Sequence, residues 1–337
     1  MRFPEFTEEW NYESLDTIAP NITSGRSKPS LGEYNLYGST GIIGKTATAD
    51  YSGDMLLVAR VGANAGSLQL VNDSCGITDN TLIIKPCKLS SHYLYFYLQH
   101  YNLNRLVFGS GQPLITAGML KKVRIPFGNQ LEQKKIENFL CCIDERITTQ
   151  NKIIEKLETL IKGIIETVIS LQKPNTLIKN CLFCNSSTLQ KSQVTETGTF
   201  PVYGATDIGG YTEAPDVNGE SILIIKDGSG VGTVKYVTGE YSYIGTLNRL
   251  TAKDGYCLKY IYFALQEFSF EPYKTGMAIP HIYFKDYGKA KIFCPNLKQQ
   301  FEIAKELSNI NDKIEVEKQI LLCLQKQKLY LLSQLFL

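Results

Sequence analysis

The sequence predicts an α+β protein with two similar globular domains, each followed by a long helix. Three observations support this fold class. The chain has 337 residues, about twice the length of an ordinary domain. Its two halves carry the same patterns in the same order. Each half also ends in a segment whose apolar residues follow a heptad spacing, which is typical of coiled-coil helices.

The internal duplication is visible in aligned segments. EYNLYGSTGIIG at 33–44 matches TFPVYGATDIGG at 199–210, and YSGDMLLVARVGANAGSLQLV at 51–71 matches VNGESILIIKDGSGVGTVKYV at 217–237. The offset is 166 residues here and 167 further on, where YLYFYL from Tyr93 matches YIYFAL from Tyr260. So small a change in offset indicates a duplication with short loop insertions.

The first ~125 residues of each half predict strands and hairpins. They are rich in Gly, Tyr, Val and Ile, and short apolar runs such as DMLLVARV and SILIIKD alternate with glycine turns. We therefore expect four parts: a globular domain over 1–128, a long helix over 129–172, a second domain over 173–297 and a second helix over 298–337.

Apolar residues recur at alternating spacings of four and three along 136–171, where only Gln150 interrupts them. The same pattern runs along 303–335, with Glu317 and Lys328 as exceptions. Because the chain must return after building the second domain, the two helices should pair antiparallel and relate the domains by a pseudo-two-fold axis. Gln150 and Glu317 are equivalent in the repeat, and they predict a buried polar layer that fixes the helix register. The alternative is that both side chains extend to solvent.

Both helical segments also carry apolar residues away from the heptad positions, which favours additional helices packing onto them. The candidates for a partner-binding surface are Ile153, Ile165, Ile169, Ile320, Leu322 and Leu332.

Composition narrows the class of protein. Lys and Arg number 35 and Asp and Glu number 33, a net charge of +2, so a strongly basic coat protein for nucleic acid is excluded. The nine cysteines are an odd number and are scattered, which favours free thiols over a disulfide framework. We find no signal peptide and no run of about 18 apolar residues, and so expect a soluble cytoplasmic protein that does not enter a membrane.

Two glycine-rich motifs resemble nucleotide sites without the required surroundings. STGIIGKT at 39–46 begins with Ser where a phosphate-binding loop has Gly, and no helix pattern follows it. DGSGVG at 227–232 precedes a β-rich segment, whereas a dinucleotide site needs a helix N-terminus there. Both are interpreted as turns or hairpins.

Catalytic and metal motifs are equally weak. Cys181 and Cys184 have the spacing of half a zinc site, but no second pair lies close in sequence. His92, His100 and His281 do not cluster with a nucleophile and a carboxylate. We therefore expect no catalytic residue, cofactor or metal, and a function in recognition.

The order of these features resembles the specificity subunit of type I restriction-modification enzymes, in which two variable domains are each followed by a long helix. The resemblance covers nearly the whole chain. It rests on Trp10 followed by SLDTIAP, the turns Tyr37-Gly38 and Tyr203-Gly204, GSGQPLIT from Gly109 beside TGMAIPHI from Thr275, and the helix openings LEQKKIENFLCCIDERI and QQFEIAKELSNINDKI. The chain departs from a perfect repeat where Trp10 lacks a counterpart and where Leu114 stands in place of His281.

This resemblance implies a non-catalytic subunit that recognises double-stranded DNA. Each globular part would be a target-recognition domain that reads one half of a split, asymmetric target. The helices would set the spacer and dock two modification (methyltransferase) subunits, and restriction subunits with translocase and nuclease activity would join the complex.

Base recognition requires side chains on loops that reach the groove edges. The repeated glycine-rich loops offer Ser39, Thr40, Arg60, Asn64, Ser110 and Gln112 in the first domain, and Thr206, Lys226, Asp227, Ser229, Lys274 and His281 in the second. The alternative for each residue is that it only shapes a turn. An alternative for the whole chain is a two-headed adaptor that binds protein or carbohydrate, with the helices as a spacer.

Overall fold

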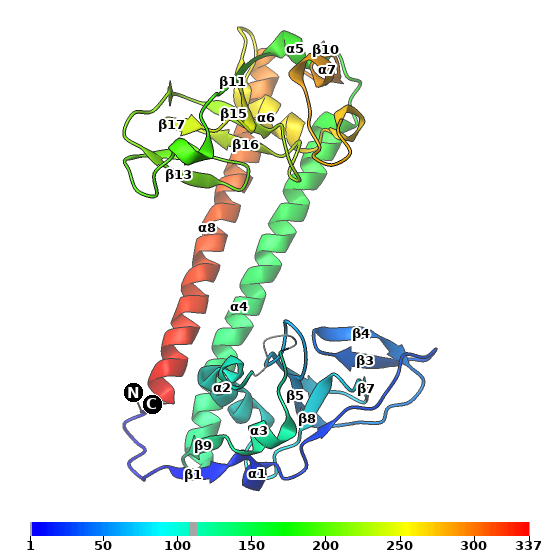
Figure 1. Ribbon diagram of the computed structural model, residues 1–337, viewed down its shortest axis with the longest axis vertical. Coiled ribbons are helices and arrows are strands. Elements are labelled where there is room, and N and C mark those ends of the chain that lie inside the picture. Colours follow the sequence, from blue (N-terminus) through cyan, green and yellow to red (C-terminus); the bar gives the residue numbers. More distant parts are fainter. Residues whose placement is uncertain (1, 108–112, 337) are drawn as a thin grey trace. The chain divides into compact units, whose positions relative to one another are not determined.

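The computed structural model describes residues 2–107 and 113–336 (Figure 1). It divides into two compact units: unit 1 comprises residues 1–151 and 319–337, and unit 2 comprises residues 152–318. Each unit therefore holds a globular head and a stretch of each long helix. We call the part of unit 1 before the first long helix head 1, and the part of unit 2 between the long helices head 2.

The described part of head 1 contains three small sheets and three short α-helices. The helices are α1 (Leu15–Ile18), α2 (Ser91–Tyr101) and α3 (Ala117–Lys121). A four-stranded sheet has the order β2 (Thr23–Ser24), β8 (Thr81–Ile84), β5 (Asp54–Ala59), β6 (Leu68–Asn72). A three-stranded sheet has the order β4 (Gly41–Thr46), β3 (Tyr34–Gly38), β7 (Gly76–Ile77), and β1 (Asn11–Ser14) pairs with β9 (Arg124–Phe127).

Head 2 repeats this arrangement. Its helices are α5 (Ile178–Cys181), α6 (Leu258–Gln266) and α7 (Phe284–Tyr287). One four-stranded sheet has the order β11 (Leu182–Ser186), β18 (Leu247–Ala252), β15 (Ser221–Ile225), β16 (Val234–Val237). The other has the order β13 (Ile208–Thr212), β12 (Phe200–Tyr203), β17 (Glu240–Tyr243), β14 (Val217–Asn218), and β10 (Thr176–Leu177) pairs with β19 (Lys291–Ile292).

The central strand of each head separates two cores, because successive side chains of a strand point to opposite faces. In β5, Leu56 and Val58 join the core that contains α2, while Met55 and Leu57 join a smaller core with Ile77 of β7. In β15 the same split occurs: Ile222 and Ile224 join one core, and Leu223 and Ile225 join the other. The uninterrupted apolar runs DMLLVA and SILII follow from burial on both faces.

The long helices are α4 (Gln130–Ile165), which continues into a π turn (Glu166–Ser170), and α8 (Leu297–Leu335). Both begin with an asparagine cap: Asn129 Oδ1 accepts from Glu132 N at 3.0 Å, and Asn296 Oδ1 accepts from Gln299 N at 3.0 Å. None of the helices in the described residues is long and apolar enough to cross a membrane.

The two helices pack antiparallel within each unit. In unit 1, Ile136 and Leu140 of α4 share a core with Leu332 and Leu335 of α8. Further along α4, Asp144 forms a salt bridge with Lys328 at 2.6 Å. Residues later in α4 therefore contact residues earlier in α8, as antiparallel packing requires. Lys328 also lies over the rings of Tyr95 and Phe96, at 5.7 and 5.5 Å from their centroids. This explains why a lysine occupies an apolar position of the heptad pattern.

In unit 2 the helices are arranged in the same way. Ile165 near the end of α4 shares a core with Leu307 of α8, and Glu158 pairs with Lys318 at 2.9 Å. Each head core thus contains the beginning of one long helix and the end of the other. The pseudo-two-fold relation between the heads stays a prediction.

Three of the six residues expected on a partner-binding surface are buried within the chain. Ile165, Ile169 and Leu332 are only 2, 3 and 4% exposed, and they belong to the main cores of the two heads. The expectation that they form an outward apolar face is therefore wrong, because each head covers the helix end that it packs against. Ile153, Ile320 and Leu322 are exposed.

The polar interruptions of the heptad pattern are also buried. Gln150 and Glu317 are 8% and 6% exposed, so neither side chain extends into solvent. Within unit 2, Lys313 forms a salt bridge with Glu317 at 2.5 Å. Control of the helix register by these residues stays a prediction.

Unit 1 has a partly buried ion pair without a counterpart among the described residues of unit 2. The carboxylate of Glu132 is fully buried and accepts from Arg2 at 2.6 and 2.7 Å and from Trp10 Nε1 at 2.9 Å. A Cβ at Gly128 would lie 1.9 Å from Glu132 Oε2, so a larger residue there would displace the carboxylate from its partners. This contact explains why Trp10 has no counterpart in the second half: it belongs to an N-terminal segment that anchors head 1 to α4.

Candidate nucleic-acid interface

Arg60 and Lys226 occupy the same structural position, directly after the central strands β5 and β15. In head 1, Arg60 N donates to Asn80 O at 2.9 Å and Arg60 O accepts from Ile115 N at 2.8 Å. In head 2, Lys226 N donates to Thr246 O at 3.0 Å and its carbonyl accepts from Ile282 N at 3.0 Å. Both heads therefore hold a basic residue at this point by the same backbone contacts.

In each head, two loops contact each other next to this basic residue. We call residues 60–67 and 226–233 the glycine loops, and residues 113–116 and 275–282 the bridging loops. Gly62 N donates to Pro113 O at 3.0 Å, and Gly228 N donates to Pro280 O at 2.9 Å. Gly62 and Gly228 have φ angles of +80° and +101°, a conformation that favours glycine. The glycines thus form a common frame for the loops.

The side chains on this frame differ between the heads. In head 1 an isolated β-bridge pairs Val61 with Leu114, which are apolar. At the equivalent position of head 2 the bridge pairs Asp227 with His281, and His281 Nδ1 lies 3.7 Å from Asp227 Oδ1. Both polar side chains are about one-third exposed and can therefore reach a ligand.

The hairpin tips lie close to the glycine loops in each head. Ser39 and Thr40 connect β3 to β4, and Thr206 lies between β12 and β13; Thr40 and Thr206 are exposed, and Ser39 is half-buried. Tyr37 O accepts from Thr78 N at 3.0 Å. Thr78 lies two residues before Asn80, whose carbonyl accepts from Arg60 N. The segment 39–46 is thus a turn followed by a strand, as expected for a hairpin rather than a phosphate-binding loop.

The same connection exists in head 2, where Tyr203 O accepts from Ile244 N at 3.0 Å. A cavity of about 280 Å³ separates the hairpin tip from β15 and β16, and both Thr206 and Thr233 line it. Lys235 pairs with Asp207 across this cavity and lies over the ring of Tyr203, 4.8 Å from its centroid. Sequence reasoning missed Lys235 because it lies inside a strand rather than on a loop.

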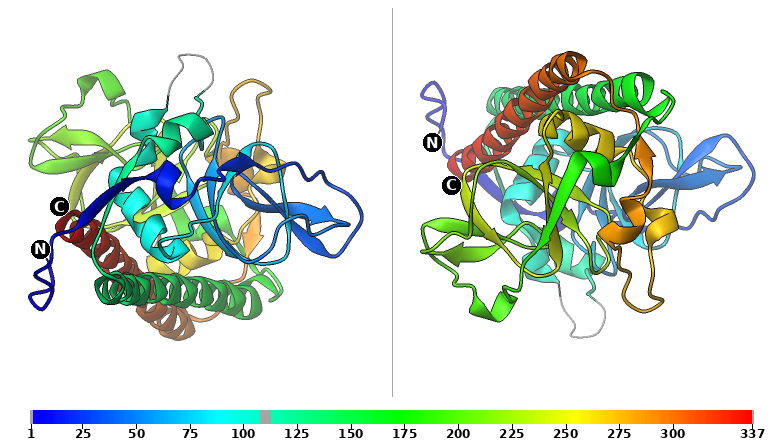
Figure 2. Two further views of the ribbon diagram at one scale, coloured as in Figure 1. Left: turned by 90° about the horizontal axis from the view of Figure 1, so that it is seen from below. Right: turned by 90° about the horizontal axis from the view of Figure 1, so that it is seen from above.

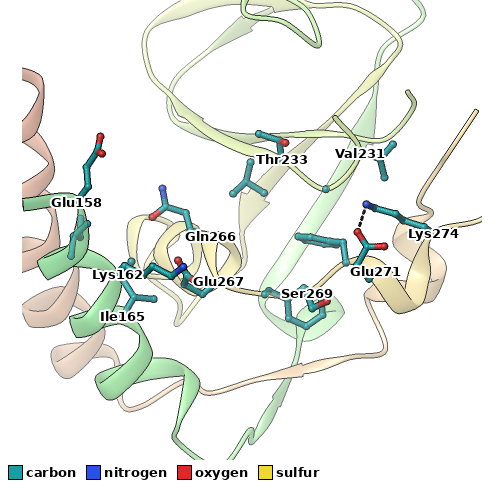
Figure 3. A pocket seen from close by; sticks show the side chains of 15 residues that line it. Glu158, Lys162, Ile165, Val231, Thr233, Gln266, Glu267, Ser269, Glu271 and Lys274 are labelled. Atoms are coloured by element: carbon teal, nitrogen blue, oxygen red, sulfur yellow. Dashed lines mark hydrogen bonds and ion pairs between the residues drawn. The ribbon is translucent and has the colours of Figure 1, made fainter. Parts of the chain in front are cut away.

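The remaining candidates lie around these loops. Asn64 and Ser229 are exposed on the two glycine loops. Lys274 precedes the bridging loop of head 2 and forms an ion pair with Glu271 (Figure 3). Ser110 and Gln112 lie outside the described residues. The structure therefore brings the described candidates of each head to one group of loops.

Two buried polar atoms at these loops have no hydrogen-bond partner among the described residues. They are Arg60 Nε in head 1 and the hydroxyl of Thr246 in head 2, whose carbonyl binds Lys226. Buried polar groups normally find partners. Arg60 and Thr246 are not equivalent in the repeat, but both belong to the backbone contacts at the ends of the central strands.

Each unit also contains a groove where its head meets a long helix. The groove of unit 2, about 640 Å³, is lined by the end of the glycine loop, the end of α6, η4 (Glu271–Tyr273) and α4 (Figure 3). The groove of unit 1, about 600 Å³, is lined by the corresponding loop, α2, η1 (Leu103–Leu106) and both long helices, α4 and α8. Ile165 and Leu332 lie in the two linings at equivalent positions of the repeat. The duplication has therefore produced two equivalent grooves.

The described residues contain no cluster of three or more His, Cys, Asp or Glu that could hold a metal ion. Cys181 is buried, and its thiol donates to Ile178 O at 3.2 Å. Burial also raises the pKa of the Cys184 thiol to about 11. These cysteines have the environment of core residues.

The fold and its repeated loops define a protein with two copies of one domain. A family model described as the type I restriction modification DNA specificity domain matches residues 2–159 and again residues 181–326. Since these matches cover most of the chain, the protein belongs to this family. It is a DNA specificity subunit of a type I restriction-modification system and the non-catalytic member of that system, as the sequence predicts.

Solved structures support the same fold. The S subunit of a type I restriction-modification system from M. genitalium is 20% identical, with a TM-score of 0.74 over 99% of this chain and 97% of that chain. A chain from a structural study of complex assembly and conformational transition of the type I R-M system is 15% identical, with a TM-score of 0.57 over 98% of both chains. The α+β fold with long packed helices is thus confirmed. No curated protein matches the sequence significantly.

Proposed function

We propose that this specificity subunit reads a bipartite, asymmetric DNA target, and that each head recognises one half-site. The observation that carries the proposal is the shared frame with different side chains. The loops of both heads are held by equivalent backbone hydrogen bonds, whereas Val61 and Leu114 of head 1 are replaced by Asp227 and His281 in head 2. Apolar and polar groups select different base edges, so the heads should prefer different sequences.

Within this proposal the basic groups and the neutral or acidic polar groups contact different parts of the DNA. Arg60, Lys226 and Lys274 are suited to phosphates or guanine, and the hydroxyl, amide, carboxylate and imidazole groups are suited to base edges. The candidates within the described residues are Ser39, Thr40, Arg60, Asn64, Thr206, Lys226, Asp227, Ser229, Lys274 and His281. Because the net charge is only +2, other subunits should supply part of the contact with the phosphates.

We further propose that two modification subunits dock on this chain, and that restriction subunits join the complex. The duplicated grooves support two docking sites of one kind, since equivalent surfaces fit two copies of one partner. Ile153 and Ile320, which are equivalent in the repeat, are both exposed on the long helices, and Leu322 is exposed near Ile320. Isolated apolar residues are common on surfaces, but exposed apolar residues at equivalent positions of both long helices favour docking.

The four parts predicted from the sequence can be given separate roles. We propose recognition domains over 1–128 and 173–297, and spacer helices over 129–172 and 298–337 that set the distance between half-sites. We also propose that the protein acts in the cytoplasm. The nine cysteines, all of them free, are suited to a reducing compartment.

Domain exchange tests the division of labour. Residues 1–128 are replaced by the corresponding segment of another family member, and methylated bases are mapped in a host that expresses the hybrid with its modification partner. We expect one half of the methylated target to change and the other to remain. A second hybrid, exchanged over 173–297, should change only the other half. The proposal is wrong if either exchange alters both halves together.

A further inference from the structure

The bridging loop of head 2 is a short loop closed at its base. Thr275 N donates to His281 O at 2.9 Å, and His281 N donates to Thr275 O at 2.8 Å. Gly276 has a φ angle of +89°, and a Cβ there would lie 2.4 Å from Ile279 O. Two further backbone hydrogen bonds hold this bridging loop against the glycine loop: Gly228 N donates to Pro280 O, and Ile282 N donates to Lys226 O. The residues between are therefore presented on a braced support, which projects from the head (Figure 2).

The tip of this loop is apolar and uncovered. Met277 is fully exposed and Ile279 is 60% exposed. Met277 has none of its surface removed from water and Ile279 keeps most of its surface exposed, so their burial contributes little to stability. Isolated apolar residues are common on surfaces, but here two of them share one braced loop whose base carries Asp227 and His281.

The surroundings of the tip indicate which part of DNA it meets. Asp227 and His281 lie at the base of the loop. The neighbouring Lys226 is held there because its carbonyl accepts from Ile282 N. The loop thus combines apolar groups, a hydrogen-bond acceptor and potential donors. The major groove presents the thymine methyl group beside donors and acceptors, whereas the minor groove has no methyl group. This combination matches the major groove.

We infer that Met277 and Ile279 contact the C5-methyl group of a thymine in the major groove of the half-site that head 2 reads. The inference rests on the proposed function, which assigns one half-site to each head. In the sequence, the positions of head 1 that correspond to Met277 and Ile279 are Ser110 and Gln112, which are polar. The methyl contact should therefore belong to head 2.

Uracil substitution tests the contact, because uracil differs from thymine only by the missing methyl group. The target is first mapped from methylated bases, and each thymine of the two half-sites is then replaced by uracil in a duplex. Binding is measured by fluorescence anisotropy with the full chain in complex with its modification partner. Loss of the contacted methyl should weaken binding of the wild-type protein about fourfold, the value of one buried methyl group.

The double variant Met277→Ala/Ile279→Ala should bind the thymine duplex more weakly and should no longer distinguish thymine from uracil in the half-site of head 2. Both side chains are exposed, so the midpoint of thermal unfolding should stay unchanged and folding should not confuse the result. The control is Leu31→Ala, which removes an aliphatic side chain that is 99% exposed and lies outside the loops. This control should retain the wild-type preference for thymine.

Two outcomes would overturn the inference: a half-site of head 2 without an A·T pair, or a double variant that prefers thymine as strongly as the wild type. Either outcome is distinguishable from failure of the proposed function. If domain exchange still alters only one half of the target, the two heads read separate half-sites and only the methyl contact is wrong.

Discussion

Head 1 and head 2 hold their central strands and loops with equivalent hydrogen bonds, yet different side chains project from them. The carbonyl of Arg60 and that of Lys226 accept from equivalent isoleucines, and Gly62 and Gly228 donate to equivalent prolines. The bridge beside each glycine is Val61 with Leu114 in one head and Asp227 with His281 in the other. The comparison teaches that backbone contacts preserve a recognition frame while its exposed positions diverge after duplication.

The units differ less in how they hold the long helices. Leu332 packs into head 1 and Ile165 into head 2, at equivalent positions of the repeat. The chief difference is the N-terminal segment, through which Arg2 and Trp10 bind the buried Glu132 in unit 1. The helix attachment is thus common to both heads, whereas the loops differ.

The largest effects should come from charges placed in the two helix attachments. Leu332→Glu and Ile165→Glu each leave an uncompensated buried charge, which destabilises a core by about 4 kcal/mol. Hydrogen exchange read by mass spectrometry should show loss of protection in unit 1 for the first variant and in unit 2 for the second. Ile320→Glu, on an exposed residue of α8, is the matched control and should leave protection intact. Equal losses in both units from either variant would mean that the heads are not separately stabilised.

Exchange of the bridge residues sharpens the comparison of the loops. Asp227→Val combined with His281→Leu gives head 2 the side chains of head 1 while keeping the backbone bridge. Binding to the native half-site of head 2 should fall about tenfold or more, since a good base contact contributes about 1–3 kcal/mol. Anisotropy with duplexes altered in one half-site at a time measures the change. Equal losses for alterations in both half-sites would contradict separate recognition.

The smallest expected effect concerns the polar interruptions of the helices. Replacing the buried Gln150 and Glu317 by Leu should raise the free energy of unfolding by about 1 kcal/mol, because buried polar groups are often less stabilising than apolar ones. The same change should loosen the spacing between half-sites, since a polar layer disfavours sliding by a heptad. Thermal unfolding and methylation of targets with varied spacers measure the two effects. Gln327→Leu, on an exposed position of α8, is the control. A double variant that is no more stable and keeps one spacer length contradicts the register hypothesis.

The sequence by itself determined the duplication, the α+β class and the two long helices. These features depend on local spacing: glycine turns between apolar runs predict hairpins, and a heptad pattern predicts a helix wherever its partner lies. The family followed from the order of the same features.

Only the tertiary structure decided which apolar residues are free and which polar residues meet. Ile165, Ile169 and Leu332 resemble Ile153 in the sequence, but the heads bury the first three and leave the last exposed. Asp227 and His281 are far apart in the chain, and the closed bridging loop places them side by side. The fully exposed tip at Met277 is equally invisible to a search for polar residues. Burial and long-range pairing depend on how distant segments pack, and local spacing carries no information about that packing.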